Sequence, residues 1–194
     1  MKAVCAVLVS ALAGLARGLA STDTITWGGD NTRAGYQTNH NMDPAIVGSS
    51  QFGQLFKTKL PGAYNGNPEQ IFSQPLVYTP KSGTKQYVYW ATTQNNIYKL
   101  DAKTGEIVAS RNLHIPFLTA DLDGCVDINP TVGITATGVI DPDSETLYLT
   151  AKTYLNQNGG NGAQGDAPMA GTMSMPLTLT TFLRSLASPS TSRD

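Results

Sequence analysis

Hydrophobic and polar positions in the middle of the chain predict an antiparallel β-meander. Tyr87–Thr92 is rich in aromatic and β-branched residues, which pack well on a pleated sheet. Gln94–Asn96 supplies residues that tolerate the positive φ angles of a tight hairpin, and Ile97–Leu100 forms the returning strand. Asp101–Gly105 makes a second turn, where the aspartate can accept hydrogen bonds from the backbone ahead and the glycine can be left-handed. Glu106–Arg111 is the third strand.

Apolar residues lie on both faces of this predicted meander. Successive side chains of a strand alternate, so Tyr87 and Tyr89 fall on one side. Val88 and Trp90 fall on the other side. A sheet that is apolar on both faces needs a cover on both, which stacked sheets provide. Core packing is therefore the role that we expect for Trp90.

Part of the pattern returns about sixty residues later in the chain. Val77 corresponds to Val139, and Val88 corresponds to Tyr148. In each copy a short strand leads through a turn into a longer strand, which in the second copy is Thr146–Ala151. A meander repeated at this spacing is typical of the blades of a β-propeller. A plain β-sandwich is the alternative.

Three segments resemble those of quinoprotein-type propellers. Asn96–Glu106 resembles their repeat, whose core reads hydrophobic-Tyr-x-Leu-Asp-x-x-Thr-Gly. Trp27–Arg33 is similar to the segment by which such chains enter the first blade, and Cys125–Thr135 to the segment that leads into the next one. The resemblance covers residues 24–168 and implies an all-β fold. That fold would be a partial β-propeller of about two four-stranded antiparallel blades, whereas closed rings use about four to eight.

The quinoprotein superfamily contains several kinds of function, so the resemblance leaves three hypotheses. The one we favour is a secreted quinoprotein-like propeller fragment without catalysis of its own. The second is part of a pyrroloquinoline quinone (PQQ) dependent alcohol or sugar oxidoreductase. The third is a binding or scaffold propeller that holds a partner through loops such as Arg111–Val126. We expect no cofactor in this chain, and PQQ with calcium only in a full-length relative.

The beginning of the chain predicts a secretory signal peptide over residues 1–20. Lys2 provides the positive charge, and Ala3–Leu15 is an apolar run too short to span a membrane. Gly18 and Ala20 place small residues at the positions required for cleavage before Ser21. We therefore expect a secreted protein that keeps no membrane segment after cleavage.

The character of the chain changes after the proposed propeller domain, which covers residues 21–168. A Gly- and Asn-rich loop at Asn156–Asp166 is followed by no further Tyr-x-Leu-Asp strand. Residues 169–194 are predicted to be a low-complexity, irregular tail with one short amphipathic helix, whose apolar positions are Leu179, Phe182, Leu183 and Leu186. Our hypothesis is that this tail reflects truncation, an altered reading frame or a retained intron. Open blade edges would then favour self-association.

Charge argues against a nucleic-acid partner. Loss of Lys2 and Arg17 with the signal lowers the basic count from 13 to 11, against 14 acidic residues. No cluster of Lys and Arg remains to form the basic surface that nucleic acids require. The mature chain keeps one cysteine, Cys125, which is either a buried free thiol or one whose partner lies in sequence outside this chain.

Candidate chemistry is sparse, and we assign no catalytic residue and no metal site. Oxygen ligands gather at Asp121, Asp123, Asp127 and Asn129, where calcium is conceivable, although a surface turn capped by its own side chains is favoured. Two histidines and three methionines have no partners at ligand spacing; they are His40, His114, Met169, Met173 and Met175.

Overall fold

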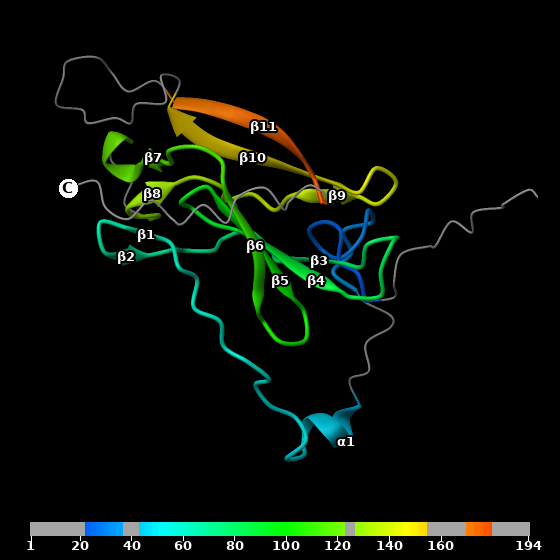
Figure 1. Ribbon diagram of the computed structural model, residues 1–194. Helices are drawn as coiled ribbons and strands as arrows, with labels where there is room; N and C mark the ends of the chain where they lie inside the picture. Colours follow the sequence, from blue (N-terminus) through cyan, green and yellow to red (C-terminus); the bar gives the residue numbers. More distant parts are fainter. Residues whose placement is uncertain (1–21, 37–42, 123–126, 155–169, 180–194) are drawn as a thin grey trace, which may run out of the picture.

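The structure is a computed structural model, which describes residues 22–36, 43–122, 127–154 and 170–179 (Figure 1). Antiparallel sheets dominate these residues, and none of the described sheets closes on itself. The all-β expectation is therefore confirmed. The predicted signal peptide lies outside the described residues. Within them, no helix is long and apolar enough to cross a membrane.

The first sheet is the predicted meander. Its strands are β3 (Leu76–Tyr78), β4 (Tyr87–Ala91), β5 (Asn96–Asp101) and β6 (Ile107–Asn112). They pair in chain order, each antiparallel to the next. All four strands and both tight turns agree with the sequence pattern.

The turns of this sheet use the predicted chemistry. Asn95 adopts a φ of 59° and Gly105 a φ of 73°. Asp101 Oδ1 accepts hydrogen bonds from the backbone N–H groups of Lys103 and Thr104, at 2.9 and 3.1 Å. A Cβ atom at Gly105 would lie 2.3 Å from the ring of Phe56, so close packing as well as φ requires glycine here.

The second sheet has the order β11-β10-β9. Its strands are β9 (Val139–Asp141), β10 (Thr146–Tyr154) and β11 (Ala170–Thr178). Val139 pairs with Tyr148, as Val77 pairs with Val88 in the first sheet. The predicted correspondence between the two hairpins is thus confirmed. The second sheet differs from the expected four-stranded blade, because the described residues give it three strands.

The expectation of an irregular or short-helical tail is wrong over β11. This segment pairs with the whole of β10, from Thr146 opposite Thr178 to Tyr154 opposite Ala170. The outer edge of β10 carries backbone groups that need hydrogen-bond partners, and β11 supplies them. Leu177 and Leu179 alternate with exposed residues and are buried, which is the period of a strand. The other positions of the expected helix lie outside the described residues.

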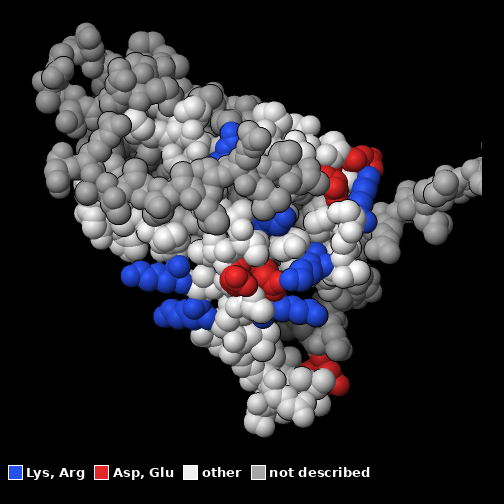
Figure 2. Space-filling view, in the orientation of Figure 1, with Lys and Arg blue, Asp and Glu red and all other residues white. Residues whose placement is uncertain are grey.

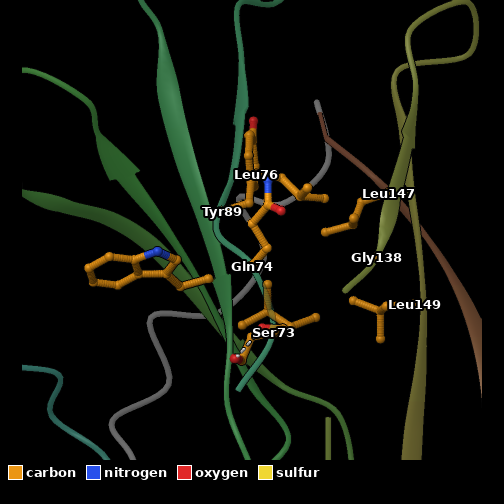
Figure 3. Close-up of a pocket in the computed structure, with 10 residues that line it drawn as sticks. Ser73, Gln74, Leu76, Tyr89, Gly138, Leu147 and Leu149 are labelled. Atoms are coloured by element: carbon orange, nitrogen blue, oxygen red, sulfur yellow. Dashed lines mark hydrogen bonds between the residues drawn. The ribbon is translucent and has the colours of Figure 1, made fainter. Parts of the chain in front are cut away.

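The two sheets pack face to face around an apolar core. Leu76, Tyr89 and Ile97 of the first sheet are buried against the second. Ile140, Leu147 and Leu149 contribute from the opposite side. Figure 3 shows Leu76 and Leu147 pointing toward each other across this interface. Burial of such side chains stabilises the fold by about 1.5–3 kcal/mol each.

The N-terminal segment joins the inner strands of both sheets. Thr24 pairs with Val77 of β3, with backbone hydrogen bonds of 2.7 and 2.9 Å. The next residue, Ile25, accepts a hydrogen bond of 2.7 Å from the backbone N–H of Ile140 in β9. Ile25 is itself part of the core. The chain therefore threads between the two hairpins and holds them together.

Shorter elements complete the described fold. Two small ladders pair β1 (Ala63–Tyr64) with β2 (Asn67–Pro68), and β7 (Phe117–Leu118) with β8 (Thr131–Val132). A single turn of 3-10 helix covers Thr119–Asp121. The helix α1 (Pro44–Val47) lies on an extended arm that reaches away from the sheets (Figure 1).

Candidate functional site

The interface between the sheets contains a small cavity, shown in Figure 3. Ser73, Gln74, Tyr89, Gly138 and Leu149 are among the residues around it. Its volume accommodates about one water molecule. A quinone cofactor has several fused rings and cannot enter this cavity. The cavity is a packing feature of the core.

A hairpin turn at the end of the first sheet is buried rather than solvated. Asn95 is wholly buried, and its Nδ2 donates to the backbone carbonyl of Lys152 at 3.0 Å. Its Oδ1 has no hydrogen-bond partner among the described atoms. Gly133 passes so close that a Cβ atom there would lie 2.4 Å from this Oδ1 and from the carbonyl oxygen of Thr93. The turn therefore locks the two sheets together.

A carboxylate with four donors lies beside the first sheet. Glu69 Oε1 accepts from Thr92 Oγ1 at 2.8 Å and from Asn96 Nδ2 at 2.6 Å. Glu69 Oε2 accepts from Tyr98 OH at 2.6 Å and from the backbone N–H of Gly62 at 3.2 Å. Because protein donors occupy its acceptor sites, this carboxylate has a structural role. It holds the segment around Glu69 against the first sheet.

The predicted oxygen-ligand loop is only partly described. Asp121 Oδ2 accepts a short hydrogen bond from the hydroxyl of Tyr154, and that hydroxyl also accepts from the backbone N–H of Leu118. Asp127 and Asn129 are exposed, and Asp123 lies outside the described residues. Over the part of the chain that the structure describes, no three His, Cys, Asp or Glu side chains gather at metal-binding distance.

The remaining candidates are not brought together. His114 is half-buried, and His40, Cys125 and Met169 lie outside the described residues. Met173 and Met175 belong to β11. Trp90 is half-buried on the first sheet with its Nε1 enclosed, which agrees with the predicted packing role.

An open groove of about 370 Å³ among the described residues has room for a ligand. Its lining comes from the turn between β3 and β4, from Tyr87 of β4, from Lys99 of β5 and from Leu179, which follows β11. The complete lining is Pro80, Ser82, Gly83, Thr84, Lys85, Tyr87, Lys99 and Leu179. We call it the Lys99 groove. Its volume falls in the range of small-molecule sites.

Two lysines and no acidic residue line the groove, while the carboxylates of Asp101 and Glu145 lie near these lysines. Lys99 Nζ lies 4.1 Å from the ring centroid of Tyr87 and 5.8 Å from that of Tyr89, in cation–π geometry. Burial lowers the pKa of Lys99, and the negative charge of Glu145 opposes that shift. Lys85 is largely exposed, and its Nζ makes a long contact of 3.9 Å with Asp101.

Sequence reasoning did not find the Lys99 groove. Residues 80–99 supply most of its lining, but Leu179, which follows β11, is remote from them in the chain. One signal was available in principle, since Lys99 lies directly opposite Tyr89, a position where the aromatic neighbour would favour an apolar residue. On the face drawn in Figure 2, acidic side chains lie among the basic ones.

Comparison of the chain with protein-family models, with curated proteins and with solved structures finds no match.

Proposed function

We propose that this chain is a secreted, quinoprotein-like propeller fragment of about two blades, without catalysis of its own. The observation that supports it is the stacking of two consecutive antiparallel sheets whose first hairpins correspond in register. Val77 pairs with Val88, and Val139 pairs with Tyr148. Neighbouring propeller blades are related in this way, each covering the apolar face of the next.

A fragment of a ring predicts self-association. The outer faces of its terminal blades would lack the blades that cover them in a closed ring, and exposed apolar faces and unpaired strand edges bind other chains. Size-exclusion chromatography with light scattering on the mature chain, residues 21–194, should show dimers or larger species. A strictly monomeric chain over a wide concentration range would contradict the proposal.

The oxidoreductase alternative is tested separately. The mature chain is supplied with PQQ, calcium, a panel of alcohols and sugars, and a redox dye. We expect dye reduction no faster than in the same mixture without protein. Reduction that requires protein, PQQ and substrate together would establish the oxidoreductase instead.

The origin of residues 169–194 is addressed by the transcript. The proposal keeps the hypothesis that a propeller sequence was truncated or altered near residue 168. Further Leu-Asp-x-x-Thr-Gly copies downstream, in any frame, would support it. The strand β11 gives this region a structural role in the present chain whichever origin it has.

The second candidate is a binding module, and the Lys99 groove is the observation that favours it. The groove has ligand-sized volume, and two lysines and a tyrosine are among its lining residues. Ligand-observed NMR with a fragment library, followed by mapping of the bound amides, tests this candidate. Fragments that all bind elsewhere would remove it.

A further inference from the structure

We propose that the Lys99 groove binds a small amphipathic carboxylate, with the carboxylate at Lys99 and Lys85 and the apolar body against Pro80 and Tyr87. This inference deepens the binding alternative above. It does not depend on whether the sheets are propeller blades, because the groove is formed by described residues of this chain alone.

The charge of the groove selects an anion. Its lining contains two lysines and no acidic residue. Over the described residues, no carboxylate lies within ion-pairing distance of Lys99. The carboxylate of Glu145 instead accepts from Tyr78 OH at 3.1 Å and from the backbone N–H of Lys81 at 2.6 Å. A half-buried ammonium group without an ion pair binds a ligand anion more strongly than an exposed lysine does.

The second cation is available to the same ligand. Lys85 contacts Asp101 at 3.9 Å, which is near the limit of an ion pair, and its side chain is 74% exposed. Such a pair contributes little to stability, so a ligand carboxylate can compete for Lys85 at small cost. Asp101 keeps its hydrogen bonds to the backbone of the turn when Lys85 moves.

The walls of the groove select an apolar body. The half-buried Pro80 and Tyr87 supply apolar surface, whereas the exposed Ser82 and Thr84 supply hydroxyl groups. The volume suits a single ring or a short chain, not a polymer. Benzoate has this size and charge, and benzyl alcohol is its neutral counterpart.

The experiment compares the two compounds on the mature chain by amide chemical-shift mapping. Benzoate should shift the amides of Ser82, Gly83 and Lys85, and benzyl alcohol at equal concentration should not. Lys99→Met keeps the stem of the side chain but removes its charge, and should weaken benzoate binding about tenfold. Lys103→Met is the matched control, because Lys103 is exposed and lies outside the groove. The affinity of this variant for benzoate should equal that of the wild type.

Three outcomes would overturn the inference. They are equal shifts with benzyl alcohol, benzoate shifts confined to other residues, and unchanged affinity in Lys99→Met. If Lys99→Met does not fold, the wild-type comparison of the two compounds still decides. Absence of benzoate binding would leave the self-association and dye assays unaffected, so failure here is distinct from failure of the propeller proposal.

Discussion

Tyr98 donates a hydrogen bond of 2.6 Å to the carboxylate of Glu69, which lies 29 positions earlier in the chain. The bond joins β5 to the segment that follows β2. Tyr98 is buried, and the same carboxylate binds Thr92, Asn96 and the backbone of Gly62. This interaction fixes an otherwise irregular segment against the outer face of the first sheet.

Removal of this hydrogen bond should destabilise the protein without changing its fold. Tyr98→Phe removes a charge-assisted hydrogen bond, and we expect a loss of about 2 kcal/mol in the free energy of unfolding. Glu69→Gln places an amide N–H₂ among donors and should cost at least as much. Urea unfolding followed by circular dichroism measures both variants. Glu106→Gln, at an exposed carboxylate, is the control and should be neutral; equal losses in all three would refute the role of Glu69.

Stability should fall at alkaline pH. Burial, before any other cause, raises the pKa of Tyr89 and Tyr98 above the ordinary value of 10.0. The folded state therefore holds these protons more tightly than the unfolded state. Their contribution is complete below about pH 10 and is lost as pH rises from there through the higher folded values.

Unfolding midpoints measured from pH 8 upward, together with tyrosinate absorbance, test this expectation. The decline should be shallower in Tyr98→Phe, which has one fewer shifted tyrosine. A midpoint that rises with pH in this range would show that the sign is wrong.

Gly133→Ala should disrupt the contact between the sheets. The added Cβ atom would lie 2.4 Å from both Asn95 Oδ1 and the carbonyl oxygen of Thr93, and neither group can move freely because both are buried. Overpacking of this kind costs about 1–3 kcal/mol. Thermal unfolding provides the measurement. Gly53→Ala is the matched control, since nothing lies within 4 Å of its Cβ position, and a similar loss there would contradict the explanation.

The strand β11 should be required for stability. Leu177→Ala removes a buried side chain from the core and should cost about 2–5 kcal/mol. Thr150→Ala, at an exposed position of β10, should have little effect. Both are measured by chemical denaturation. If Leu177→Ala were as stable as wild type, the side chain of Leu177 would not contribute to the core.

The first sheet could be predicted from sequence because its determinants are local. Alternating apolar positions, an Asn at a left-handed turn position and the Asp-x-x-Thr-Gly turn all act within a few residues. Tyr87–Ala91 and its neighbours therefore form the expected strands. The hairpin correspondence of Val77 with Val139 was also visible, because strand and turn lengths repeat.

Long-range contacts determined the features that the sequence pattern did not predict. The tail showed a helical spacing at Leu179, yet the open edge of β10 and the core beside Leu177 outweighed that weak local preference and made β11 a strand. The Lys99 groove brings Leu179 beside residues 80–99, and the Glu69 contacts bring residues 62–69 against β5, so both depend on segments that meet only in the folded chain. The sequence by itself determined the strands and turns of the first sheet and of the β9–β10 hairpin, since these follow from periodicity and local backbone preference. Only the tertiary structure decided which charges would face a groove and which would be buried, because that depends on distances between segments remote in the chain.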